Sequence, residues 1–190
     1  VARAVKDGTL PEDAVNESAR RVLKLVFRAN ETLKSKPSCD YEMHHETARK
    51  AAEQGAVLLK NEDGILPLSH SQRLAVIGSM AKKIRYQGAG SSHINPQKLS
   101  QPLDYLPGTE FAMGCNDHGD TDESMIKEAV RAAENADAVV VFAGLPDRFE
   151  SEGFDRDNMK LPEGHLKMIE EVSSTNKNTI VVLLSGCVVE

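Results

Sequence analysis

Four short apolar runs, separated by stretches with helical periodicity, constrain the fold of this chain more than any other feature. The runs occupy residues 74–78, 110–114, 138–145 and 179–184. The third reads Ala-Val-Val-Val-Phe-Ala-Gly-Leu, and continuous apolarity of this length is typical of a strand covered on both faces of a parallel sheet. We therefore predict an α/β fold, a three-layer α/β/α sandwich with a mostly parallel sheet.

Two helices are predicted between these strands. The first has apolar residues at helical spacing over residues 125–133, and Asp120 is expected to cap it. The second is expected to begin at residues 161–163, with Pro162 at the first helical position. Its buried face is predicted to consist of Leu166, Ile169 and Val172. Earlier in the chain, Asp63-Gly64 lies between two apolar runs and predicts an extended or hairpin-like segment.

The first part of the chain predicts a separate organisation. An amphipathic helix is expected over residues 11–30, and the polar residues after it resemble an exposed linker. We expect residues 1–30 to belong to a domain that is otherwise missing, residues 31–43 to be the linker, and residues 44–190 to be a partial α/β domain. Since the chain begins without Met and ends directly after an apolar run, we interpret it as a fragment of a longer protein.

Charge and composition argue against several classes of function. The formal net charge of −6 disfavours binding to nucleic acid, and no apolar run approaches the length of a membrane span. Cys39, Cys115 and Cys187 are odd in number and widely separated, which predicts buried or reduced thiols rather than a disulfide or zinc site. These thiols favour a cytoplasmic location, which the sequence otherwise leaves unknown. His44 and His45 diverge on a helix, and we expect no metal and no cofactor.

Two loops are rich in small and polar residues. The glycine-rich loop at residues 88–93 fails the dinucleotide pattern at His93, but its glycines permit close approach of a ligand, to which Ser91 and Ser92 could donate hydrogen bonds. A plain surface loop is the alternative. The oxygen-rich residues 116–122 do not match calcium-loop spacing, and helix capping explains them better.

The acidic loop at residues 149–156, Phe-Glu-Ser-Glu-Gly-Phe-Asp-Arg, follows the third apolar run directly. It has two interpretations on charge alone. One is a solvated acidic turn in which Arg156 pairs with a neighbouring carboxylate. The other is a catalytic site, because a carboxyl crowded by other carboxylates has a raised pKa, as a general acid requires. Gly153 would then provide the tight bend that presents the acid.

At residues 150–156 and 159–162 the chain resembles glycoside hydrolase family 3, most closely its β-glucosidase branch. The acidic loop carries the E-G-x-D-R pattern, and the opening of the family's second domain, its first interior strand, its serine-bearing glycine loop and a later strand follow in the same order. These further segments are residues 51–61, 65–68, 74–78, 88–92 and 178–183.

The resemblance implies a two-domain retaining glycosidase. A (β/α)8 barrel supplies an aspartate nucleophile, and an α/β sandwich domain supplies the general acid/base. Glu152 aligns with the acid/base glutamate, and Ser91 aligns with a serine close to the substrate pocket, although relatives often have Gly where Ser92 stands. Asp155 and Arg156 are expected to shape the loop.

The resemblance also identifies the first helix as the last helix of the missing barrel, so the fragment alone is expected to be inactive. The expected partners are a β-glucoside or oligosaccharide substrate and the missing barrel domain of the same parent chain, with no nucleic acid and no membrane. The alternative is a non-catalytic α/β module that binds sugar or a partner protein.

Overall fold

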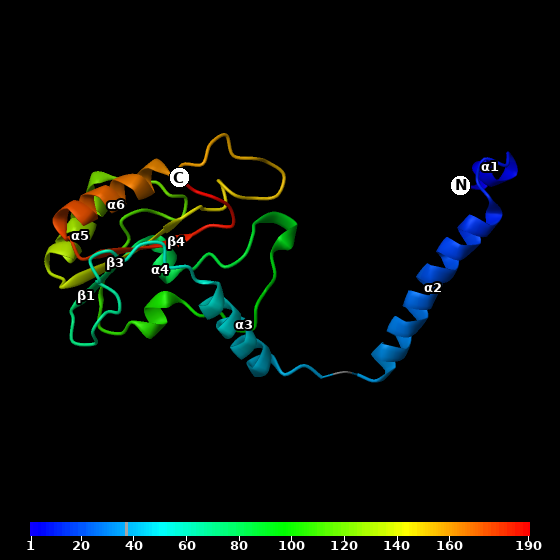
Figure 1. The fold of residues 1–190 in the computed structure, drawn as a ribbon, viewed down its shortest axis with the longest axis horizontal. Helices are drawn as coiled ribbons and strands as arrows, with labels where there is room; N and C mark the ends of the chain where they lie inside the picture. The colour runs from blue at the N-terminus through cyan, green and yellow to red at the C-terminus, as the bar shows by residue number, and fades with distance from the viewer. Residues whose placement is uncertain (37) are drawn as a thin grey trace. The chain divides into compact units, whose positions relative to one another are not determined.

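The computed structural model describes residues 1–36 and 38–190, which divide into two compact units, Val1–Ala56 and Val57–Glu190. The first unit contains the helices α1 (Ala2–Lys6), α2 (Glu12–Lys34) and α3 (Tyr41–Gly55) (Figure 1). Pro37, within the predicted linker, lies outside the described residues. None of the residues of these three helices is buried. Even the apolar side chains of α2 are exposed, for example Val22 (63% exposed) and Phe27 (64% exposed).

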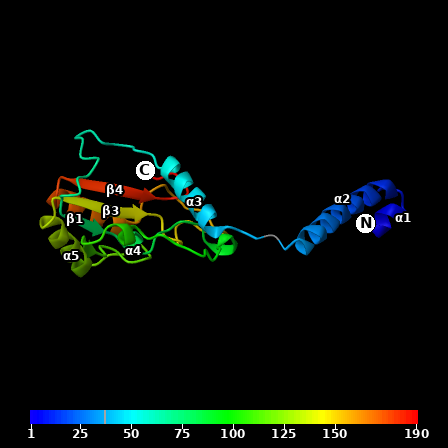
Figure 2. The same cartoon turned by 90° about the horizontal axis from the view of Figure 1, so that it is seen from below.

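The second unit is built on a parallel four-stranded sheet with the order β2-β1-β3-β4. Its strands are β1 (Leu74–Ile77), β2 (Glu110–Ala112), β3 (Ala138–Gly144) and β4 (Thr179–Leu184). Figure 2 labels β1, β3 and β4 in this sheet. All four apolar runs therefore form strands, and the prediction of a parallel sheet is confirmed. Every residue of β3, an interior strand, is buried.

Alternate side chains of β3 belong to two hydrophobic clusters, one on each face of the sheet. Val139, Val141 and Ala143 pack with the side chains of α5 (Glu123–Glu134) and α6 (Glu163–Thr175). Val140 and Phe142 pack on the opposite face, with residues of α4 (Ser79–Lys82) and the short 3-10 helix η2 (Pro102–Tyr105) and its flank. Coverage on both faces makes three layers, and it explains why the strand has no polar alternation.

The predicted starts of the two helices were wrong by small steps. Asp122, not Asp120, caps α5, and its carboxylate accepts a hydrogen bond from the Met125 amide at 2.8 Å. The Asp120 carboxylate instead binds Arg148, whose Nη2 lies 2.5 Å from Oδ1. Pro162 immediately precedes α6 rather than occupying its first turn. Proline tolerates both positions, since neither needs its missing amide proton.

The buried face of α6 also differs from the prediction. Val172 is buried and Ile169 is partly buried, but Leu166 is 42% exposed, and His165 is fully buried in its place. The His165 ring lies against the end of β3, with Nδ1 2.9 Å from the Gly144 carbonyl oxygen. The buried face of the helix is thus centred on His165, Met168 and Val172, and burial lowers the pKa of His165.

The segment before the sheet contains no strand over residues 57–73 and has turns at residues 62–63 and 70–71. The Asp63-Gly64 turn forms, and the Asn61 side chain stabilises it by donating to the Leu66 carbonyl at 3.0 Å and accepting from the Leu66 amide at 3.1 Å.

The three cysteines are free. Cys115 is buried, which raises the pKa of its thiol to about 11, whereas Cys39 and Cys187 are exposed. Within the part of the chain that the structure describes, no helix has the length and apolarity of a membrane span.

Candidate active site

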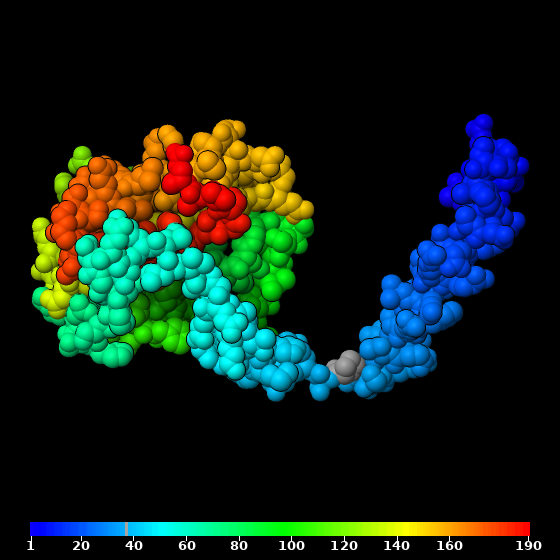
Figure 3. All heavy atoms as spheres, viewed as in Figure 1, coloured from blue at the N-terminus to red at the C-terminus, as the bar shows by residue number. Residues whose placement is uncertain are grey.

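Three segments that leave the sheet meet at one edge of the second unit. Since the strands are parallel, the chain leaves β1, β3 and β4 at the same carboxyl edge, where open α/β sheets bind ligands. The segment after β3, residues 145–162, contains the acidic loop. Figure 3 shows this gold segment beside the red segment that follows β4. The residues that join the three segments are Arg85, Ser91, Glu150, Glu152 and Gly186.

Glu152 and Ser91 are brought into direct contact from segments far apart in the sequence. The Ser91 backbone amide donates to Glu152 Oε2 at 2.9 Å, and the Ser91 hydroxyl donates to the same oxygen. Gly90, at φ +79°, precedes Ser91, and a Cβ atom there would lie 3.0 Å from Glu152 Oε2. The loop thus needs glycine both for its backbone conformation and for the approach of the carboxylate.

The contact forms the wall of a small surface hollow. Its volume is about 380 Å³, and the acidic loop and the glycine-rich loop both line it. The bend predicted at Gly153 is present, with φ +99°, next to Glu152. The lining residues are Gly88, Ala89, Ser91, Ser92, Glu150, Ser151 and Glu152. The structure therefore brings together the two residues that the sequence singled out, from loops that follow β1 and β3.

The pKa of Glu152 departs from the expectation of a crowded, raised carboxyl. The hydrogen bond from the Ser91 hydroxyl, and then that from its amide, lower the pKa of Glu152 below its ordinary value. The Glu152 side chain is exposed, so desolvation opposes this effect only weakly. The expected crowding is missing because the nearest carboxylate in sequence, Glu150, interacts with an arginine.

Glu150 is held by contacts on several sides. Its Oε2 accepts hydrogen bonds from Arg85 Nη1 at 2.7 Å and from the Gly186 amide at 3.0 Å. Burial raises the pKa of Glu150, but hydrogen bonds from Cys187, Gly186 and Arg85 together leave the pKa below its ordinary value. Glu150 is therefore an ionised structural carboxylate, and its neighbour Glu152 is the one presented to solvent.

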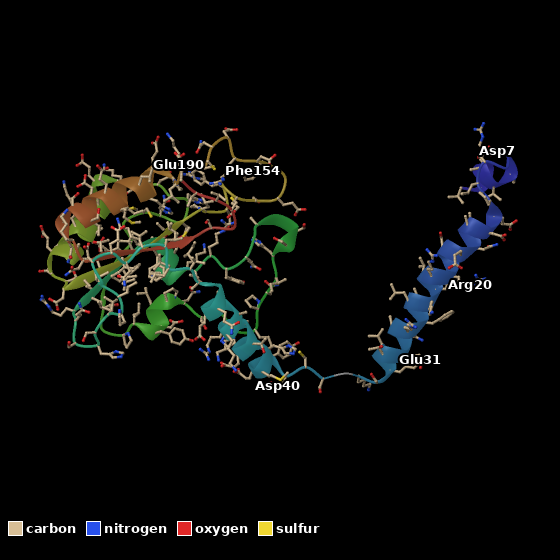
Figure 4. All side chains as sticks on the ribbon, in the orientation of Figure 1. Asp7, Arg20, Glu31, Asp40, Phe154 and Glu190 are labelled. Carbon is tan, nitrogen blue, oxygen red and sulfur yellow. The ribbon has the colours of Figure 1, made fainter. Side chains whose placement is uncertain are left out.

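The far part of the acidic loop lies against the end of the chain. Arg156 Nη2 donates to the Val188 carbonyl at 2.6 Å, and the Glu190 amide donates to the Met159 carbonyl at 2.9 Å. Figure 4 marks Phe154 on this loop and Glu190 at the end of the chain. Asp155 is exposed. The contact of Arg156 is of the kind that shapes a loop.

A second hollow, of about 490 Å³, lies between the far part of the acidic loop and the start of α6. Arg148 and Asp120 both line it and bind each other, and the Arg148 guanidinium stacks over Phe149, 4.9 Å from the ring centroid.

The Asn116 side chain organises the neighbouring oxygen-rich loop, residues 116–122, by accepting hydrogen bonds from the amides of His118 and Asp120. Across residues 1–36 and 38–190 no three His, Cys, Asp or Glu residues are grouped so that they could hold a metal ion.

Arg85 is the site residue that the sequence did not reveal. Its Nη1 donates to the Leu145 carbonyl as well as to Glu150, and its Nη2 donates to the Glu150 carbonyl at 2.8 Å. A single arginine in an irregular loop has no spacing signature. The only hint is its place shortly before Gly88, in the loop that carries Ser91.

Comparison with known proteins gives the class to which this chain belongs. A sequence model described as the glycosyl hydrolase family 3 C-terminal domain matches residues 56–190. The chain therefore belongs to glycoside hydrolase family 3, as its resemblance indicated, and it contains that family's C-terminal domain.

Known proteins are similar to this chain along its whole length or nearly so. The thermostable β-glucosidase B of Acetivibrio thermocellus is 44% identical over all of this chain and 26% of its own length. An exo-α-(1→6)-L-arabinopyranosidase of Bifidobacterium longum is 38% identical over all of this chain and 27% of its own length. The crystal structure of a Bifidobacterium adolescentis GH3 β-glucosidase superposes with a TM-score of 0.91 at 38% identity, over 99% of this chain and 28% of that one. The chain spans about a quarter of the length of these relatives.

Proposed function

We propose that this chain supplies the general acid/base of a retaining, β-glucosidase-like glycoside hydrolase, and that Glu152 is that residue. The observation that carries the proposal is the hollow in which an exposed Glu152 carboxylate accepts two hydrogen bonds from Ser91 at the carboxyl edge of the sheet. The choice of a β-glucosidase-like activity follows the relative described as a thermostable β-glucosidase B, which is 44% identical to this chain.

Glu152 suits the role better than the neighbouring Glu150. A general acid/base must reach the glycosidic oxygen and must exchange its proton during the reaction. The carboxylate of Glu150 is occupied by Arg85 and by the Gly186 amide. The carboxylate of Glu152 lines the hollow, and among the described residues its hydrogen bonds come from the amide and the hydroxyl of Ser91.

The proposed chemistry has two steps. Glu152 first donates its proton to the departing glycosidic oxygen while a nucleophilic carboxylate attacks the anomeric carbon. The Glu152 carboxylate then takes a proton from the water that attacks the glycosyl-enzyme. The second carboxylate must lie about 5–5.5 Å from the first in a retaining enzyme, and we place it in the remainder of the protein, on a barrel domain.

Ser91 favours the ionised state of Glu152. Its two hydrogen bonds favour the carboxylate, the form that exists after the first proton transfer. Exclusion of water by substrate and by a facing domain would raise the pKa of Glu152 and restore the protonated form that the first step needs. Ser91 lies at the hollow, where its hydroxyl can also bind a sugar hydroxyl, as a substrate-binding residue would.

The first unit supports the proposed division of the protein. The exposed apolar side chains on α2, Val22, Leu23, Val26 and Phe27, form a face that requires an apolar partner. We propose that residues 1–30, which contain α1 and most of α2, belong to the end of the barrel domain, and that residues 44–190 are a partial sandwich domain. The proposed linker, residues 31–43, includes the last turn of α2 and the start of α3. The isolated chain, without the nucleophile, should be inactive.

The test is substitution of Glu152 in the full-length protein. Glu152→Ala should lower kcat/KM by roughly 10²–10⁴-fold for aryl β-glucosides with poor leaving groups, the range that general acid/base catalysis contributes. Substrates with good leaving groups need little protonation, so their kcat/KM should fall least. Azide should raise the turnover of the variant with good leaving groups by attacking the glycosyl-enzyme without general-base help.

Asp157→Asn is a matched control, because Asp157 is an exposed carboxylate in the same segment after β3. It should leave both the leaving-group dependence and the azide response unchanged. An equal loss for all leaving groups in Glu152→Ala, with no azide effect, would reject Glu152 as the acid/base. Full activity of that variant would favour the alternative, a sugar-binding or partner-binding module without a catalytic role.

A further inference from the structure

We infer that Arg85 and Glu150 are positioning residues that fix the location of Glu152 by clamping the first part of the acidic loop to the sheet. The inference rests on the proposed function, because it assigns these residues a role in the same reaction. Neither residue is proposed to contact the substrate. Their effect is transmitted through the backbone between Glu150 and Glu152.

Arg85 contacts both ends of the segment that leads from β3 to the acid. At the near end it donates to the Leu145 carbonyl, one residue beyond the strand. At the far end it donates to both the carboxylate and the backbone carbonyl of Glu150. In between, Arg85 Nε lies 3.4 Å from Asp147 Oδ1. One guanidinium therefore sets the path of residues 145–150, and its planar fork holds several acceptors in a fixed geometry.

Glu150 extends the clamp to the segment after β4. Its Oε2 accepts the Gly186 amide at 3.0 Å, and a Cβ atom on Gly186 would lie only 2.9 Å from Oε1. The backbone after β4 thus fits against the carboxylate. Three segments that follow three different strands are joined at one carboxyl group, two residues before Glu152.

Burial separates this ion pair from those on the surface of the second unit. The side chains of Arg85 and Glu150 are only 12% and 20% exposed. In the Arg73–Asp137 pair the corresponding values are 72% and 41%. A pair shielded from water is less screened and holds its geometry more firmly than an exposed pair.

The clamp also links the two walls of the hollow. Arg85 belongs to the loop that carries Ser91, whereas Glu150 belongs to the loop that carries Glu152. The Arg85–Glu150 contact therefore fixes the distance between the two loops, and with it the contact between Ser91 and Glu152. If the clamp is weakened, the carboxyl moves relative to the glycosidic oxygen, and proton transfer is sensitive to displacements of about 1 Å.

The experiment compares Glu150→Gln and Arg85→Lys in the full-length protein with Glu152→Ala and with a surface control, Asp137→Asn. For each variant, kcat and KM are measured with aryl β-glucosides whose leaving groups range from poor to good, and folding is checked by circular dichroism. With poor leaving groups, Glu150→Gln should lower kcat/KM by about 10- to 100-fold, but with the best leaving group by less than about threefold. Arg85→Lys keeps the charge but loses the fork, so we expect the same pattern with a smaller loss.

A merely structural role would reduce the folded fraction and lower the rate equally for all leaving groups. That uniform loss, or no loss, in both clamp variants would overturn the inference. Asp137→Asn should show no leaving-group dependence beyond that of the unsubstituted protein. If Glu152→Ala itself shows no leaving-group dependence, the proposed function fails instead, so the two failures are distinguishable.

Discussion

The two-sided burial of β3 leads to a prediction that compares two paired valines. Val141 on β3 and Val181 on β4 are register partners, but Val141 is fully buried whereas Val181 is 37% exposed. Val→Ala removes the same two carbon atoms at both positions. At Val141 the lost transfer free energy is about 1.6 kcal/mol, and the cavity left between the sheet and the helices brings the total to about 2–3 kcal/mol. At Val181 the partial exposure and the absence of a closed cavity reduce the cost to about 1 kcal/mol.

The measurement is thermal unfolding of the chain followed by far-UV circular dichroism. For a domain of this size about 1 kcal/mol corresponds to about 3 °C, so Val141→Ala should lower the Tm by about 6–9 °C and Val181→Ala by about 3 °C. In the full-length protein neither substitution should change the dependence of kcat/KM on the leaving group, because neither residue belongs to the clamp. Equal Tm shifts for the two variants, or a larger shift for Val181→Ala, would refute the interior position of β3.

Two further predictions concern pH. Ser91→Ala in the full-length protein removes a donor that lowers the pKa of Glu152, so the alkaline limb of the kcat/KM profile should move to higher pH. The control is Ser92→Ala, which should leave the limb in place because the Ser92 hydroxyl donates to the Ala89 carbonyl. An unmoved limb in Ser91→Ala would argue against Glu152 as the proton donor. His165 has a pKa below its ordinary 6.5 in the folded state, so the unfolded chain binds more protons as the pH falls below about 6.5 and stability should decrease there. Urea unfolding at several pH values should show that this decrease is smaller in His165→Gln but retained in His70→Asn, where the histidine is exposed; equal pH dependence in all three proteins would show that His165 does not cause it.

The elements of the sheet could be predicted from the sequence because their signal is local. A strand buried on both faces has to be apolar throughout, and residues 138–144 satisfy that requirement with no help from distant residues. The start of α5 was mispredicted for the opposite reason. Asp120 and Asp122 both precede the helix, and which of them caps it depends on Arg148, which binds the Asp120 carboxylate from 28 residues away.

The candidate site shows the same limit. Glu152 and Ser91 were identified by resemblance, but their contact is set by the meeting of two loops, and its effect on the pKa of Glu152 is opposite to that expected from neighbouring charges. The sequence shows three carboxylates close together and predicts mutual repulsion. In the folded chain Glu150 is paired with Arg85, a residue 65 positions earlier, and that long-range pair removes the repulsion.

The position of the clamp determines where the acidic loop tolerates a change of length. Between Leu145 and Glu150 the chain must match the span of a single arginine side chain, so one inserted or deleted residue there would break the contact at one end. Between Gly153 and the buried Leu161 the described hydrogen bonds to residues far along the chain are those of Arg156 with Val188 and of Met159 with Glu190. Loop length and composition can therefore vary in that part, next to the second hollow, while the location of Glu152 is preserved.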